Sequence, residues 1–132
     1  MTDRIEPAWL DAEIALAVHD RQLAEHGGGA GVRDAGLLES ALGRPINRWL
    51  YDEGEDRCVL AAAYAFGVAR NHPFVDGNKR TAWVLARLFL ALENVPIRFE
   101  PEDAIAMVLA LSAGELSEAG VADWFRAHLA DA

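Results

Sequence analysis

The chain has 132 residues, of which 52% are hydrophobic and 25% charged, which suits one folded domain over residues 1–132 and excludes a disordered chain. Its 12 Lys and Arg residues against 21 Asp and Glu residues give a formal net charge of −9, which argues against direct binding of nucleic acid. A single cysteine excludes an intrachain disulfide, and no apolar run reaches the roughly 18 residues of a membrane span. The opening MTDRIEPAW lacks an apolar signal core, so we expect a cytoplasmic protein with no membrane partner.

The spacing of apolar residues predicts a first helix from Pro7 to about Glu25, with Pro7 in its first turn. The glycine-rich run GGGAG follows at residues 27–31. We interpret this run as a helix C-cap and loop, because it follows a helix instead of a strand and does not match the nucleotide-binding pattern GxGxxG.

Asp34 is expected to cap a short helix through LLESALGR, residues 37–44. Pro45 is expected to end this helix, because proline disfavours a helical conformation at the residue before it. The next stretch, INRWLYDEGE at residues 46–55, has no clean period. It predicts either a loop or a short extended hairpin.

The centre of the chain predicts two strong helices, from Asp56 to Asn71 and from Gly77 to about Glu93. A turn is expected between them at residues 72–76, where Pro73 interrupts the helical pattern. Cys58 lies among small apolar residues of the first of these helices and is expected to be a core residue.

The carboxy-terminal part predicts two more helices, from Glu102 to about Ser112 and from Ser117 to about Ala130. Trp83 and Trp124 fall on helical apolar stripes and are expected in the core, whereas Glu118 and other acids at helix starts are expected to face solvent. The chain therefore predicts an all-α fold, a compact single-domain bundle of about six helices with little or no sheet.

Residues 72–80, HPFVDGNKR, lie between the two strongest helices and at the start of the second. The first backbone N–H groups of a helix have no partner within the helix, and the helix dipole places partial positive charge there. Gly77 allows a bulky anion to approach the backbone, and Asn78, Lys79 and Arg80 add donors around the same point. Lys79 is also the only lysine of the chain. The stretch predicts a phosphate-binding nest that lacks the pattern of a P-loop.

Two further groups in this stretch are not needed for anion binding alone. Asp76 would repel a phosphate unless a cation lay between them, and a carboxylate together with phosphate oxygens is a usual way to hold Mg²⁺. His72 can accept a proton from a hydroxyl near neutral pH. Together these residues indicate transfer of part of a nucleotide to a hydroxyl with Mg²⁺ as the metal, while Phe74 is expected to point into the core.

Each of these residues alone also has an ordinary structural interpretation. His72 could be a structural histidine at a helix end, Asn78 only a helix cap, and Arg80 only a surface ion-pair partner. Their combination in this order favours the functional interpretation. The remaining histidines lack an acidic or cysteine partner at metal-ligand spacing and predict no zinc site. They are His19, His26 and His128.

The stretch HPFVDGNKR resembles the Fic-domain motif, and its lysine resembles that of the death-on-curing, or Doc, branch of the Fic/Doc superfamily. Segments 19–45 and 71–94 are also similar to this branch, and the similarity extends from about residue 9 to residue 125. The resemblance implies a compact all-helical fold and a role for each motif residue. It implies His72 as the general base, Asp76 as the Mg²⁺ ligand, and Gly77, Asn78 and Arg80 as the phosphate-binding anion hole.

The family also uses a flap before the helix that precedes the motif, which aligns the target by strand-like pairing. Residues 46–55 occupy that place in the sequence. The resemblance therefore implies that Trp49 or Tyr51 contributes to target binding.

Lys79 distinguishes two activities within the resemblance. Most Fic enzymes have glycine there and transfer AMP, because glycine leaves space for the β- and γ-phosphates of ATP. The Doc branch has lysine and resembles kinases that bind ATP in the reversed direction and transfer its γ-phosphate to a Ser or Thr hydroxyl. This implies a toxin in which His72, Lys79 and Arg80 are catalytic and Gly77, Asn78, Lys79 and Arg80 bind ATP, with translation elongation factor Tu as the target. AMP transfer and a catalytically silent binding module remain the alternatives.

Many Fic enzymes carry their own inhibitory helix, with Ser or Thr four residues before Glu-Gly or Glu-Asn. This chain has such pairs at residues 53–54 and 93–94, but Trp49 and Phe89 precede them. The inhibitory pattern is absent, so the resemblance implies a toxin that is silenced by a separate antitoxin, as Doc is by Phd.

Overall fold

The structure is a computed structural model that describes residues 5–51 and 56–130. Within these residues it contains six helices and no strand beyond two isolated bridges, and none of the helices is long and apolar enough to cross a bilayer. The helices are α1 (Ala12–His26), α2 (Ala35–Tyr51), α3 (Arg57–Asn71), α4 (Asn78–Leu92), α5 (Pro101–Ser112) and α6 (Glu118–Ala127). The predicted all-α bundle of about six helices is confirmed.

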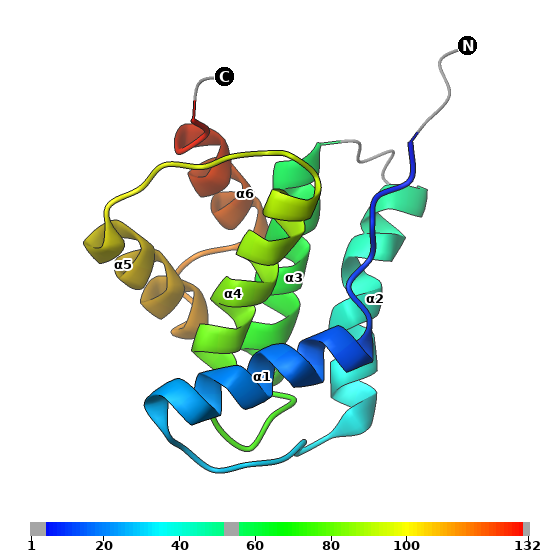
Figure 1. Ribbon diagram of the computed structural model, residues 1–132. Coiled ribbons are helices and arrows are strands. Elements are labelled where there is room, and N and C mark those ends of the chain that lie inside the picture. Colours follow the sequence, from blue (N-terminus) through cyan, green and yellow to red (C-terminus); the bar gives the residue numbers. More distant parts are fainter. Residues whose placement is uncertain (1–4, 52–55, 131–132) are drawn as a thin grey trace.

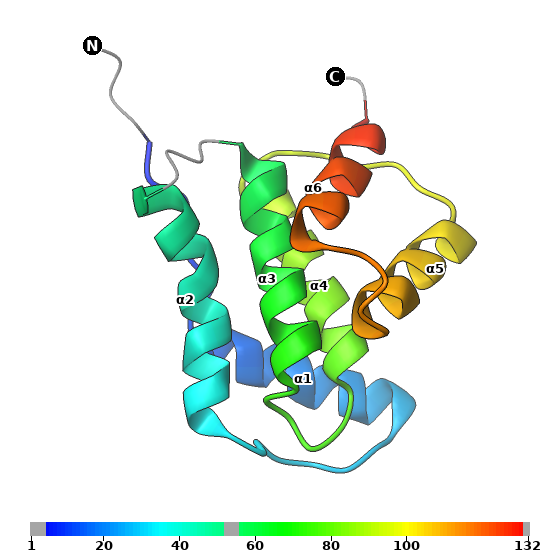
Figure 2. The same cartoon turned by 180° about the vertical axis from the view of Figure 1, so that it is seen from behind.

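Helix α3 lies at the centre of the bundle and packs against α2, α4 and α6 (Figures 1 and 2). It buries ten of its 15 residues, and small side chains on it let neighbouring helices approach closely. A methyl group added to Gly67 would lie only 3.0 Å from Cα of Ala41 in α2. Cys58 is buried in this core as predicted, and burial raises the pKa of its thiol to about 11.

Helix α2 continues to Tyr51, beyond the end predicted at Pro45. Pro45 lies inside the helix, and its buried side chain extends the apolar face formed by the preceding turns. A proline removes one backbone hydrogen bond, but the helix continues past it, where Arg48 bonds Glu118 of α6 and Trp49 packs on Trp9. The predicted loop or hairpin is therefore wrong for residues 46–51, and residues 52–55 lie outside the described part of the chain.

The course of α2 also separates its last turn from the predicted site. Helix α2 runs antiparallel to α3, so Tyr51 lies near the start of α3 at the top of Figure 1, whereas His72 follows the opposite end of α3. A helix of 15 residues spans about 22 Å. Trp49 instead packs edge-on against Trp9, with 6.0 Å between the ring centroids. The flap role implied for Trp49 or Tyr51 is wrong for both residues.

Two predictions at helix starts also need correction. Helix α1 begins at Ala12 instead of Pro7, because the Asp11 carboxylate accepts the N–H of Ile14 at 2.9 Å and caps the helix there. Glu118 is buried instead of facing solvent. Its two carboxylate oxygens accept hydrogen bonds from arginines of α2, and so tie α6 to α2 across the central helix. These arginines are Arg44 and Arg48.

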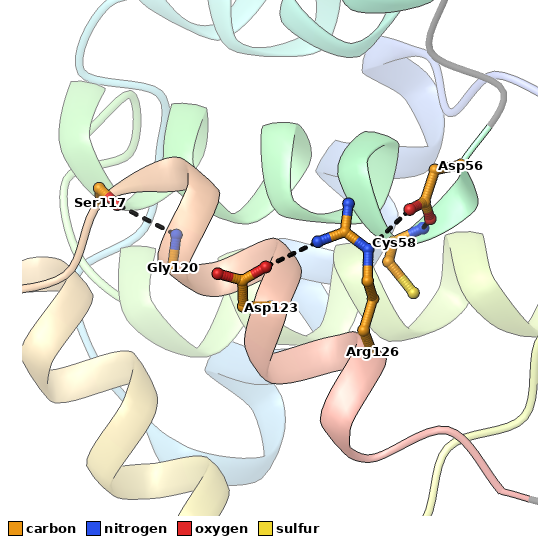
Figure 3. Close-up of polar contacts among 6 residues, drawn as sticks. All are labelled: Asp56, Cys58, Ser117, Gly120, Asp123 and Arg126. Carbon is orange, nitrogen blue, oxygen red and sulfur yellow. Dashed lines mark hydrogen bonds and ion pairs between the residues drawn. The ribbon is translucent and has the colours of Figure 1, made fainter.

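Figure 3 shows how α6 is attached to the start of α3. Asp56 accepts the N–H of Cys58 at 2.8 Å, which caps α3, and its second oxygen accepts Nε of Arg126 at 2.7 Å. Burial raises the pKa of Asp56, but the hydrogen bonds from Arg126 and Cys58 outweigh burial and lower the pKa overall. Ser117 caps α6 by accepting the N–H of Gly120 at 3.0 Å. Asp56 and Arg126 lie at the end of α3 opposite His72, so their contact bears on stability.

Candidate active site

The site loop is the segment 72–77 that joins α3 to α4, and it begins with a left-handed residue. His72 has φ 49° and ψ 56°, and its N–H donates to the carbonyl of Val68 at 3.2 Å, which closes the end of α3. Arg33 donates through Nε to the carbonyl of His72 at 2.7 Å and through Nη2 to that of Asn71 at 2.8 Å. A left-handed conformation is unfavourable for a non-glycine residue, so these hydrogen bonds hold the position from which the His72 side chain projects.

The segment that follows the GGGAG run lies along the site loop, at the bottom of Figure 1. The N–H of Val75 donates to the carbonyl of Gly31 at 3.0 Å, and the N–H groups of Arg33 and Asp34 donate to the carbonyl of Pro73 at 2.7 and 3.1 Å. The predicted C-cap is confirmed at Gly27, which has φ 77°. The prediction missed that the rest of this loop supports the site.

Two buried motif residues clamp the site loop from inside. Phe74 is buried as predicted, and its backbone N–H and carbonyl both bond the side-chain amide of Asn78, each at 3.0 Å. The side chain of Asn78 is thereby used within the loop. A contribution of Asn78 to an anion hole would then come from its backbone N–H at the start of α4.

Gly77 adopts a left-handed conformation, which glycine permits, with φ 75° and ψ 16°. It is the N-cap residue of α4 and has no side chain that could cap the helix. The carboxylate of Asp76 takes part in the start of α4 instead. Its Oδ1 accepts the N–H of Gly77 at 2.8 Å, and its Oδ2 accepts the N–H of Gly29 at 3.3 Å. These hydrogen bonds, from Gly77 first and then from Gly29, lower the pKa of Asp76, and the charge of Arg80 adds to the effect.

Asp76 is exposed and ionised at neutral pH, and these properties fit a ligand for Mg²⁺. Among the residues that the structure describes, no group of three or more His, Cys, Asp or Glu side chains gathers where it could hold a metal ion. Mg²⁺ usually binds through one or two carboxylates together with phosphate oxygens and water. A single carboxylate beside a nest for phosphates therefore fits Mg²⁺ that arrives with a nucleotide.

The motif residues open into a cavity of about 810 Å³ between α4 and α5. Its polar end brings together all the residues predicted for the site, and its other end is lined by Trp83, Phe99 and α5. Trp83 packs edge-on against Trp124 as expected of a core residue, with 5.8 Å between centroids, and it also forms part of this wall. The predicted residues on the cavity are His72, Asp76, Gly77, Asn78, Lys79 and Arg80.

A second cavity of about 680 Å³ adjoins the first, and His72 and Lys79 line both. Its other lining residues come from the end of α5 and the turn that follows, including Leu109, Ser112 and Glu115. His72 and Lys79 thus lie between two spaces, one with the anion nest and one without it. This arrangement suits transfer of a group between two bound molecules.

A family model described as the Fic/DOC family matches residues 9–90. The chain belongs to the Fic/DOC family. A Fic/DOC relative named "Protein kinase doc", from Escherichia phage P1, is 37% identical over 117 residues, which cover 89% of this chain and 92% of the relative. Another, named "Toxin Doc", from Mycolicibacterium smegmatis (strain ATCC 700084 / mc(2)155), is 44% identical over 72 residues, which cover 54% of this chain and 55% of that protein. The predicted resemblance to the Doc branch is confirmed.

Proposed function

We propose that this Fic/DOC protein is a Doc-like toxin that transfers the γ-phosphate of ATP to a Ser or Thr hydroxyl of a target protein. The observation that carries the proposal is the position of Lys79, the only lysine, beside Arg80 in the nest and within the same cavity as His72. The similarity to a relative named as a protein kinase over 89% of the chain supports it.

In this proposal His72 acts as general base. The hydroxyl oxygen of the target attacks the γ-phosphorus while His72 takes the hydroxyl proton. The bond from the γ-phosphorus to its bridging oxygen breaks, and ADP leaves. His72 lines both cavities, so it would be within reach of a hydroxyl bound in one and a phosphate bound in the other.

The remaining motif residues hold the nucleotide. At the N-terminal end of α4, Gly77 would let phosphate oxygens approach, the backbone N–H of Asn78 would donate to them, and Arg80 would add a planar pair of donors. Lys79 would place a point charge beside the phosphate chain and fill the space that AMP transfer needs. Mg²⁺, bound with ATP through Asp76, would neutralise phosphate charge.

We propose translation elongation factor Tu as the target class and a separate Phd-like antitoxin as the partner. The absence of the family's inhibitory pattern from the sequence supports silencing in trans. Co-expression with the neighbouring reading frame should relieve toxicity and yield a complex that co-purifies. If neither occurs, the antitoxin part of the proposal is wrong.

The experiment that tests the activity uses purified protein, elongation factor Tu or bacterial extract, and ATP labelled at either the α- or the γ-phosphate. We expect γ-label alone to transfer. His72→Ala should lower the rate by about 100-fold or more, as for loss of a general base. His26→Ala is the matched control, because His26 is exposed and does not line the cavity. Transfer of α-label would identify an AMP transferase, and ATP binding without transfer would identify a silent module.

A further inference from the structure

His19 of α1 is a buried histidine that the proposed mechanism does not use. Its side chain is 1% exposed, and its ring stacks on Phe74 of the site loop with 3.9 Å between centroids and 8° between planes. Its Nε2 lies 2.8 Å from the carbonyl oxygen of Asp76. Because a carbonyl oxygen only accepts, Nε2 carries the proton and donates it. The ring therefore contacts the site loop through both its face and its edge.

The hydrogen bond from His19 bears on the orientation of one peptide group. The carbonyl of Asp76 and the N–H of Gly77 belong to the same planar peptide and point to opposite sides of it. With the carbonyl directed at His19, the N–H faces the other way and donates to the Asp76 carboxylate at 2.8 Å. Glycine adopts left-handed and right-handed conformations with similar ease, so without an anchor this peptide could rotate at little cost.

We infer that His19 is a positioning residue, which fixes the Asp76–Gly77 peptide and through it the orientation of the Asp76 carboxylate. The inference rests on the proposed function for the role of that carboxylate toward Mg²⁺. A buried polar side chain is costly unless it is hydrogen-bonded, and an apolar ring would stack on Phe74 equally well. What histidine adds over such a ring is the donor directed at Asp76.

Two substitutions separate the donor from the ring. His19→Phe keeps an aromatic ring against Phe74 and removes the donor. His19→Gln keeps an N–H donor near the position of Nε2 and removes the ring. A role in packing alone predicts that the Gln variant is the more disturbed of the two. A positioning role through the hydrogen bond predicts the reverse.

The first measurement is the amide resonance of Gly77 in ¹H–¹⁵N spectra of the free protein, followed then through a titration with Mg²⁺ in the presence of ADP. We expect the Phe variant to shift this resonance and to weaken its response to Mg²⁺, and the Gln variant to resemble the wild type. The second measurement is the Mg²⁺ dependence of γ-label transfer at fixed ATP. The Mg²⁺ concentration for half-maximal rate should rise about 10-fold in the Phe variant, as for other groups that orient a metal ligand. Its limiting rate at saturating Mg²⁺ should fall much less.

The inference is overturned if the Phe variant keeps the Gly77 resonance and the Mg²⁺ dependence of the wild type, or if the Gln variant is as disturbed as the Phe variant. If the Phe variant fails to fold, the Gln variant alone can test the inference. A folded Gln variant whose Gly77 amide resonance has moved from its wild-type position refutes the role of the donor. If the wild-type protein transfers no phosphate, the proposed function fails. The spectra of the free protein still test the positioning of the peptide in that case.

Discussion

Gly28→Ala is a sharp test of how the loop after α1 supports the site. A methyl group at Gly28 would lie 2.8 Å from Oδ2 of Asp76, closer than real Cβ contacts come, and a tight 3.2 Å from its Cγ. Gly28 also has φ 123°, which L-residues rarely adopt. Gly27→Ala is the matched control, because Gly27 has φ 77° and an added methyl group there meets nothing within 4 Å. Both variants carry backbone strain, and only Gly28→Ala pushes on the carboxylate.

The strain should lower the free energy of unfolding by about 1–3 kcal/mol in each variant, measured by urea unfolding. Only Gly28→Ala should move Oδ2 away from the N–H of Gly29, which lies 3.3 Å from it. The pKa of Asp76 is held low by the N–H groups of Gly77 and Gly29, so it should rise in this variant and stay low in the control. The carboxyl carbon of Asp76, followed by ¹³C NMR from neutral to acid pH, reports this pKa directly.

The same displacement should raise the Mg²⁺ concentration that phosphate transfer requires, by about 10-fold in Gly28→Ala. The control should match the wild type once both variants are assayed well below their unfolding temperatures. If the two variants give the same Asp76 pKa and the same Mg²⁺ dependence, the loop only connects α1 to α2, and its proposed support of the carboxylate is refuted.

Three further predictions concern stability, each measured by urea unfolding. Gly67→Ala should lower the free energy of unfolding by about 1–3 kcal/mol, because the new methyl group meets the α2 backbone at 3.0 Å. In the control Gly43→Ala the new methyl group meets nothing within 4 Å, so this free energy should rise by up to about 1 kcal/mol. Equal effects of the two substitutions would refute the close contact between the helices. Glu118→Ala should lower the free energy of unfolding by about 1–3 kcal/mol. This is less than the loss of a partner from a fully buried ion pair, because the two arginines that bond Glu118 are partly exposed and can rehydrate. An unchanged free energy would show that these ion pairs contribute nothing to stability. Arg126→Ala should raise the pKa of Asp56 and cost about 0.5 kcal/mol, since both side chains are two-fifths exposed. Because the pKa of Asp56 is lowered in the folded state, Arg126→Ala should lower the free energy of unfolding at neutral pH and cease to do so as the pH falls below 3.8. A destabilisation that does not depend on pH would contradict this role of Asp56.

Most of the helices could be predicted from the sequence because apolar residues recur along them at helical spacing. The failure at the end of α2 has a physical cause in tertiary contacts. Residues 46–51 have no clean period because their side chains contact different elements: Arg48 bonds Glu118 of α6, and Trp49 packs on Trp9 of the amino-terminal segment. A helix with partners on several sides has no single apolar face, and Pro45 adds a local preference that packing overrides.

The site was predictable to the extent that its residues are contiguous. The motif brings a histidine, an acidic residue and two cations into nine consecutive positions, which a sequence displays directly. The residues that hold this loop come from elsewhere: Arg33 lies 39 positions before His72, and His19 lies 57 positions before Asp76. Only His19 left a trace in the sequence, as a polar residue four positions after Ala15 on the buried side of α1. Nothing in the sequence alone indicates the contact of Arg33.

Burial divides the motif into two sets with different tasks. The exposed set, His72, Asp76, Lys79 and Arg80, carries the charges and the imidazole that the proposed function uses. The buried set, Pro73, Phe74 and Asn78, fixes the backbone that joins α3 to α4, two helices that pack against each other.

Under the proposed function, this division accounts for how an acidic protein would bind ATP. The net charge of −9 repels ATP at a distance, but interactions between exposed charges are largely screened beyond about 8 Å at physiological salt. Within that distance the nucleotide would meet the N-terminal end of α4, Lys79 and Arg80, which the buried residues hold in place. Binding should therefore depend on the geometry of the site loop far more than on the overall charge of the protein.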